Sequence, residues 1–265
     1  MLKFRLALLV LLVSIAALPE FVSAQAVNTI GPDTAFTSAI YKGSQGVLPY
    51  RLLLPAKVKD GKKYPLVINL HGSGERGGDN VVQLMYIKDL YLNPKNRKKF
   101  PAYVLAPQCP AEQRWASYSF RNPNWKYDPT PTGPMQNLME LIKETMEKYP
   151  IDPQRVYVTG LSLGGNGTFD IVARNPGKFA AAAPVCGWGD STYIDPLLPT
   201  QWWIFHGSVD AAVPVGLSRA MYKAIKAKGG KVKYTEYPGV NHDSWKPAYK
   251  EKKFLKWMFS KKLKK

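Results

Sequence analysis

The chain has 265 residues, of which 45% are hydrophobic and 21% are charged. This balance is typical of one globular domain and excludes a collagen-like or largely disordered chain. The formal net charge is +18, which suits anionic partners in general, but many of the lysines fall in surface-helix or tail positions and are interpreted as solvated. No zinc-finger spacing or RNA-binding signature accompanies them, so nucleic acid is not expected as a partner.

The first residues predict a secretory signal peptide over 1–24. Two cations precede an apolar run over 6–18, and small residues follow at 22–24, where a signal peptidase would read them. The run is shorter than the ~20 apolar residues that span a bilayer, which makes a membrane anchor the weaker alternative. We therefore expect a secreted or periplasmic protein with one domain over 25–265 and no membrane insertion of the mature chain.

After this segment, two β-leaning runs flank a Gly-rich turn and predict a hairpin. Short apolar runs follow, each the length of a strand buried on both faces, and amphipathic helical patterns lie between several of them. Strands that alternate with helices predict an α/β fold, with a mostly parallel central sheet covered by helices on both faces and the antiparallel hairpin at its edge. The predicted strands cover 35–41, 48–54, 66–70, 103–106, 156–158, 180–185, 202–205 and 232–237, and the clearest helices cover 134–149, 215–228 and 247–260.

The segment 160–165 reads GLSLGG and fits the pattern G-x-S-x-G around Ser162. The pattern is short, but a strand over 156–158 precedes it and a helical pattern over 168–174 follows it. A strand, a sharp turn and a helix are what a serine nucleophile needs in order to project from the carboxyl edge of a sheet. We interpret Ser162 as a nucleophile and not as a plain Gly-rich turn.

A serine hydroxyl needs a neighbouring base, and the chain has three histidines. In this kind of site the chain order is serine, acid, histidine, so His242, in the loop before the last helix, is the predicted base. The acid should follow a strand between the two, which favours Asp210, with Asp190 as the alternative.

An oxyanion hole needs two backbone N–H donors. The residue after the nucleophile, Leu163, is expected to supply one of them. The Gly-rich segment after the 66–70 strand is expected to supply the other, from Ser73 or, as the alternative, from Gly74.

The longest irregular segment, 108–132, carries five aromatic residues among prolines and polar residues. Long loops of this kind often form a lid or a binding rim, but the aromatics could equally serve only to pack the loop down. Trp125 in this loop, together with Trp188 and Trp245 beside the expected site, is a candidate substrate contact.

The chain has two cysteines, Cys109 and Cys186, each at the end of an apolar strand. Export permits a disulfide between them, but the sequence does not place them within bridging distance, so the bond stays open. Neither cysteine lies in a metal-ligand spacing such as C-x-x-C, and no metal or organic cofactor is expected.

Five segments together resemble one family: HGSGERG at 71–77, APQC at 106–109, the segment around Ser162, PVCG at 184–187 and FHGSVD at 205–210. They are similar to secreted α/β-hydrolases of the predicted peptidase or phospholipase/carboxylesterase group, close to feruloyl-esterase and polyhydroxybutyrate-depolymerase-like enzymes. The resemblance implies the α/β-hydrolase fold and a Ser162, Asp210 and His242 triad.

The resemblance further implies a secreted serine carboxylic-ester hydrolase that acts through an acyl-enzyme. Feruloyl or acetyl esters of plant polysaccharide are the expected substrates, although this fold hosts many activities. Two alternatives stay open: a serine peptidase of the same fold, and a non-catalytic binding protein on a hydrolase scaffold.

Overall fold

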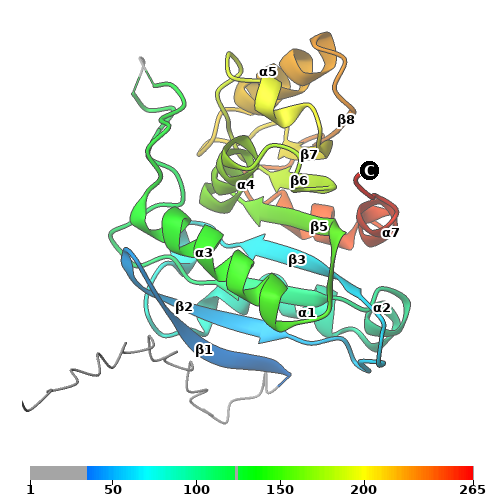
Figure 1. Cartoon of the computed structure of the whole chain (residues 1–265). Coiled ribbons are helices and arrows are strands. Elements are labelled where there is room, and N and C mark those ends of the chain that lie inside the picture. Colours follow the sequence, from blue (N-terminus) through cyan, green and yellow to red (C-terminus); the bar gives the residue numbers. More distant parts are fainter. Residues whose placement is uncertain (1–34, 123–124, 265) are drawn as a thin grey trace, which may run out of the picture.

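The computed structural model describes residues 35–122 and 125–264, which form one eight-stranded sheet with helices on both faces (Figure 1). The strand order across the sheet is β1-β2-β4-β3-β5-β6-β7-β8. The mostly parallel sheet predicted from the sequence is confirmed, because every neighbouring pair from β4 onward in this order is parallel. The strands are β1 (Phe36–Gly43), β2 (Gly46–Leu53), β3 (Tyr64–Leu70), β4 (Tyr103–Pro107), β5 (Ile151–Leu161), β6 (Ala181–Val185), β7 (Gln201–Gly207) and β8 (Val232–Tyr237).

The N-terminal hairpin is also confirmed, at the edge of the sheet. β1 and β2 pair antiparallel along their full length, from Phe36 opposite Leu53 to Gly43 opposite Gly46. Gly46 closes the turn with a φ of +95°, which glycine adopts without steric cost. β2 also pairs antiparallel with β4, so the hairpin extends the parallel sheet directly.

The parallel strands are buried on both faces, which explains why they read as continuous apolar runs. In β3, Leu66, Ile68 and Leu70 belong to one core cluster, while Val67 between them belongs to the other. Apolar side chains of helices α3, α4 and α5 pack in the first cluster, and those of α1, α6 and α7 pack in the second. The sheet therefore separates two cores, and its carboxyl edge is free to carry a site.

The helices agree with the sequence in the middle of the chain and differ from it elsewhere. The helices predicted over 134–149 and 215–228 are confirmed by α3 and α5. The two short helices before β4, α1 and α2, were not predicted from the sequence. The helices are α1 (Lys88–Leu92), α2 (Pro94–Lys99), α3 (Gly133–Lys148), α4 (Leu163–Arg174), α5 (Val215–Ala227), α6 (Trp245–Lys250) and α7 (Phe254–Phe259), with short 3-10 helices η1 (Ser73–Glu75), η2 (Val82–Leu84) and η3 (Asp195–Leu197).

The single last helix predicted over 247–260 is wrong, because the structure has α6 and α7 separated by an extended Glu251. Residues five apart on one continuous helix point about 140° apart. The break instead lets Tyr249 and Phe254 both pack on the core, with their ring centroids 5.6 Å apart. Charged residues fill the turn between the two helices, where the chain reaches solvent.

Three further expectations concern segments or bonds outside the sheet. The predicted signal peptide over 1–24 lies outside the described residues. Cys109 and Cys186 are both buried and free, so they form no disulfide. Among the helices of residues 35–122 and 125–264, none has the length and apolar character needed to cross a bilayer.

Candidate active site

Ser162 lies at the sharp turn between β5 and α4. Its φ of +52° falls in a region that residues other than glycine rarely adopt. The glycines beside it make the turn possible, because a Cβ on Gly164 would overlap the carbonyl oxygen of Leu70, and a Cβ on Gly165 would lie 2.7 Å from that of Val185. The G-x-S-x-G pattern thus presents one hydroxyl at the carboxyl end of β5, with 8% of the residue exposed.

The structure brings together the three residues that the sequence proposed as a triad. His242 Nε2 lies 2.9 Å from Ser162 Oγ, and His242 Nδ1 lies 2.8 Å from Asp210 Oδ2. Asp210 follows β7 and His242 follows β8, so all three residues sit where parallel strands end, at the edge where ligands bind in open α/β sheets. An imidazole in this position can take the hydroxyl proton while the carboxylate fixes its tautomer.

The Asp210 carboxylate is kept ionised by hydrogen bonds. Burial by itself raises its pKa, but hydrogen bonds from His206, His242 and the Val213 N–H outweigh burial and hold the pKa well below its usual range. Its Oδ1 accepts the N–H groups of Ala212 and Val213, each at 2.9 Å. His206 is not among the site residues predicted from the sequence, although its position four residues before Asp210 is a usable signal.

The loop after β3 is braced around a neutral histidine. His71 Nδ1 lies 2.6 Å from the Gly72 carbonyl oxygen, and Nε2 accepts the Cys109 N–H at 2.9 Å, so the ring proton is on Nδ1. Burial lowers the pKa of His71 to about 4, which keeps the ring neutral. The Glu75 carboxylate accepts the Gly72 N–H at 2.8 Å. Together these bonds fix the main chain that leads into Ser73.

The two residues predicted to supply the oxyanion donors line the same pocket as Ser162. Ser73 and Leu163 both line it, whereas Gly74, the alternative donor, does not. Leu163 begins α4, where the first N–H groups have no partner within the helix. Two N–H groups from separate turns that meet at one pocket can bind the oxygen of a tetrahedral intermediate.

The pocket over Ser162 has a volume of about 340 Å³, which is within the range of small-ligand sites. Trp188 and Phe120 form one wall, with their rings edge to face and the centroids 4.9 Å apart. The Asn166 side chain donates to the Trp188 carbonyl oxygen at 3.1 Å and holds this wall on the helix behind the serine. The loop over 108–132 therefore contributes to the pocket rim.

The other two tryptophans proposed as substrate contacts lie elsewhere. Trp125 stacks on Tyr118 at 5.6 Å and does not line the pocket. Trp245 touches the His242 ring edge-on at 5.4 Å but lines a neighbouring pocket together with Tyr86. A tryptophan in a loop can pack inward or face a site, and the sequence does not separate the two cases.

Asp190, the alternative acid, belongs to the rim and does not contact the triad histidine. Its carboxylate accepts the Tyr127 N–H at 2.9 Å. Arg174 of α4 anchors the same loop, because it donates to the carbonyl oxygens of Asp128 and Pro129 at 2.7 Å each. Both residues thus fix the position of the long loop.

One cluster among the described residues has the spacing of a metal site. Its members are Cys186, Asp210 and His242, whose ligand atoms all lie within 4.8 Å of one another. The aspartate and histidine are already hydrogen-bonded to each other. Burial raises the pKa of the Cys186 thiol well above its usual range, so it is a neutral thiol and a poor ligand. The set fits a hydrogen-bonded triad beside a thiol better than it fits a metal.

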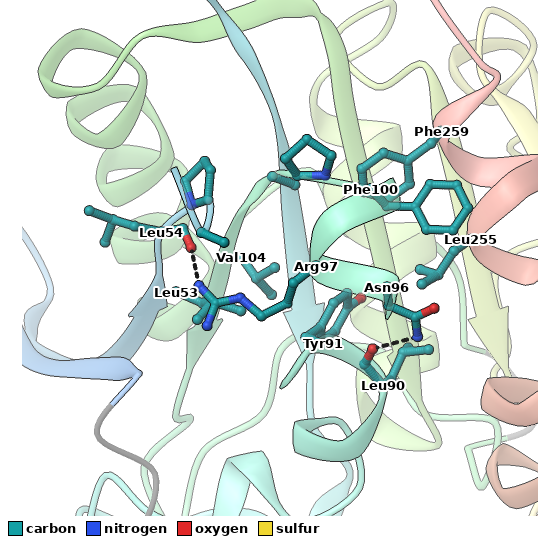
Figure 2. A pocket seen from close by; sticks show the side chains of 14 residues that line it. Leu53, Leu54, Leu90, Tyr91, Asn96, Arg97, Phe100, Val104, Leu255 and Phe259 are labelled. Atoms are coloured by element: carbon teal, nitrogen blue, oxygen red, sulfur yellow. Dashed lines mark hydrogen bonds between the residues drawn. The ribbon is translucent and has the colours of Figure 1, made fainter. Parts of the chain in front are cut away.

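A separate cavity lies at the opposite edge of the sheet, lined by mostly apolar side chains (Figure 2). Leu53 and Val104 line it where β2 ends and β4 begins. Arg97 enters it but donates to the Leu54 carbonyl oxygen at 3.0 Å. Its volume of about 20 Å³ holds roughly one water molecule, so it is a packing gap and not a ligand site.

The sheet order, the turn at Ser162 and the bonds of His242 define an α/β-hydrolase. The chain belongs to the phospholipase/carboxylesterase family, which matches residues 56–258.

Solved structures and curated proteins give further similarities. A thermostable esterase is 36% identical with a TM-score of 0.80, over 86% of this chain and 63% of that one. A ferulic acid esterase from Anaeromyces mucronatus has a TM-score of 0.63 at 16% identity, over 87% and 94% of the two chains, and shows the fold alone. An uncharacterized secreted protein of Arthroderma benhamiae is 24% identical over 238 residues, 73% of this chain and 23% of that protein. The chain spans about a quarter of the length of the curated relatives it matches.

Proposed function

We propose that this protein is a serine carboxylic-ester hydrolase that works through an acyl-enzyme. One observation carries the proposal: a single imidazole, that of His242, bridges the hydroxyl of Ser162 at 2.9 Å and the carboxylate of Asp210 at 2.8 Å. This arrangement raises the nucleophilicity of a hydroxyl that is otherwise a weak nucleophile.

The mechanism follows from these contacts. His242 Nε2 takes the proton of Ser162 Oγ as the oxygen attacks the ester carbonyl, and the N–H groups of Leu163 and Ser73 bind the resulting oxyanion. The intermediate collapses, the C–O bond to the alcohol breaks, and the alcohol leaves with the proton from His242. A water molecule then attacks the acyl-enzyme, gives its proton to the same imidazole, and releases the acid as the proton returns to Ser162.

We propose feruloyl or acetyl esters of plant polysaccharide as the substrates and an exported protein as the setting. The aromatic wall of Trp188 and Phe120 beside Ser162 suits a planar cinnamoyl group. A ferulic acid esterase among the similar folds and a secreted protein among the relatives support the same reading.

The test is hydrolysis of methyl ferulate, p-nitrophenyl acetate and a chromogenic peptide by the purified protein. Ser162→Ala should lower the turnover of the cleaved ester by about 10⁴–10⁶. Ser260→Ala, which removes an exposed hydroxyl far along the chain, is the matched control and should keep full activity.

Each outcome indicates a different function for this protein. Preference for ferulate supports a plant-wall esterase, and preference for acetate supports a deacetylase or general carboxylesterase. Peptide cleavage with both esters untouched would establish the peptidase alternative instead. Failure to label with a fluorophosphonate, together with no hydrolysis, would establish a non-catalytic scaffold.

A further inference from the structure

Three arginines surround the pocket that holds Ser162. Arg76, Arg114 and Arg121 all line it, whereas no aspartate, glutamate or lysine among the described residues does. The composition makes this concentration notable, because only nine of the 37 basic residues in the chain are arginine. The overall positive charge comes mainly from lysine and does not account for an arginine-lined pocket.

Arg76 is held in place by neutral groups only. Its Nε donates to the Ser73 carbonyl oxygen at 3.0 Å, and its Nη1 donates to the Gln113 carbonyl oxygen at 3.3 Å. A guanidinium has five N–H donors, so donors beyond these two bonds stay available. Because Arg76 is bonded to Ser73 itself, the cation lies close to the proposed oxyanion site.

Arg114 and Arg121 approach the pocket from the long loop that forms its rim. Both are exposed, and neither forms an ion pair with a described residue. Among the other described arginines, Arg155, Arg174 and Arg219 pair with carboxylates at 2.6–2.7 Å. Arg51 and Arg97 instead donate to main-chain carbonyl oxygens. The pocket therefore gathers three cations that no carboxylate of the described chain neutralises.

The planar fork of arginine matches the two oxygens of a carboxylate, and the bond is stronger where water is partly excluded. Building on the proposed function, we propose that the site selects esters that carry a carboxylate, bound by Arg76 together with Arg114 and Arg121. The carboxylate belongs either to the acyl part or to the alcohol part of the substrate, as in an ester of an acidic sugar. A neutral ester reacts at the same serine but lacks this anchor.

The experiment compares esters that carry a carboxylate with esters of the same shape that carry a neutral carboxamide in its place, at low ionic strength. For the alcohol side the pair is 4-acetoxybenzoate and 4-acetoxybenzamide, and for the acyl side it is phenyl hydrogen adipate and its terminal amide. We expect kcat/KM for the carboxylate ester to exceed that for the carboxamide ester by about tenfold or more in one pair, the gain of one hydrogen bond between charged groups. The pair that responds identifies the side of the ester that carries the anion.

The variant Arg76→Gln/Arg114→Gln/Arg121→Gln should bring this ratio to within about twofold, the level expected without the ion pair. The control Lys143→Gln/Lys223→Gln/Lys264→Gln removes the same charge from exposed positions and should keep the ratio. The ratio is measured within each variant, so a general loss of activity cancels. If the triple variant does not fold, Arg114→Gln/Arg121→Gln, at two exposed positions, must lower the ratio.

Equal kcat/KM values within both pairs for the unaltered protein would overturn the proposal. So would an equal fall of the ratio in the lysine control, because the preference would then come from net charge. The proposed function fails separately if Ser162→Ala still cleaves the neutral carboxamide esters. If Ser162→Ala loses all cleavage but the unaltered protein shows no preference for the carboxylate esters, only the carboxylate site is refuted.

Discussion

His206 Nε2 lies 3.1 Å from Oδ2 of Asp210, the same oxygen that lies 2.8 Å from His242 Nδ1. The His206 ring is fully buried, and its Nε2 also lies 3.0 Å from the Val213 carbonyl oxygen. Two acceptors at one nitrogen require a proton there, so His206 donates to the carboxylate. Its Nδ1 lies 2.7 Å from the Ser218 hydroxyl, which holds the ring in this orientation.

This relationship makes His206 a positioning residue for Asp210. His206→Leu should lower kcat by about tenfold to hundredfold, the value of a hydrogen bond to a charged group. His206→Gln, whose amide can place an N–H near the same point, should restore most of the activity. In His206→Leu the pKa of the Asp210 carboxyl should rise towards its usual range, because one of the hydrogen bonds that hold it down is lost, so the acid side of the kcat/KM profile should move to higher pH. An unchanged profile alongside a lower folding stability would show a purely structural role.

The identity of the acid is tested by two matched substitutions. Asp210→Asn should lower turnover by about 10⁴, because an amide holds His242 in the wrong tautomer. Asp190→Asn should change turnover by less than about tenfold, since Asp190 accepts the Tyr127 N–H in the rim and acts only through the loop. Steady-state kinetics on one ester decides the matter, and a reversed order of the two effects would transfer the acid role to Asp190.

The close packing at the serine turn predicts a strong effect of one methyl group. Gly164→Ala places a Cβ against the carbonyl oxygen of Leu70, which is main chain and cannot move aside. We expect a loss of about 3 kcal/mol or more in the free energy of unfolding, the upper range of overpacking. Gly74→Ala is the control, because its Cβ would meet no atom within 4 Å. Chemical denaturation of both variants checks the prediction, and equal stabilities would contradict the geometry of the turn.

The buried His71 predicts a specific pH dependence of stability. Its pKa falls from 6.5 to about 4 on burial, so between these values the unfolded chain binds a proton that the folded chain does not. Stability should therefore fall as the pH drops through this window, by about 3 kcal/mol in total from this residue.

His71→Asn removes the titrating ring and should flatten this part of the curve. The variant loses the bond to the Cys109 N–H at every pH, so it should be less stable at neutral pH and approach the unaltered protein as the pH falls. Urea denaturation at a series of pH values measures both curves. Parallel curves would mean that His71 keeps its ordinary pKa in the folded protein.

Local patterns in the sequence sufficed for the fold and for the central contacts of the site. The GLSLGG segment at 160–165 predicts the turn because its three glycines stand where a Cβ would collide with the main chain of neighbouring segments. The chain order of serine, acid and histidine selected Asp210 and His242, which the structure brings within hydrogen-bond distance. Amphipathic periodicity located α3 because this helix buries one face on the sheet.

Contacts between distant segments needed the tertiary structure. The break between α6 and α7 lets Tyr249 and Phe254 pack in one core, and helical periodicity alone does not predict it. His206 resembles any strand-end histidine until β7 places it against Asp210. The three arginines are polar residues in ordinary loops, and only the folding of two separate loops over Ser162 turns them into one charged pocket. Side-chain convergence depends on the path of the whole chain, whereas turn and periodicity signals depend on neighbouring residues.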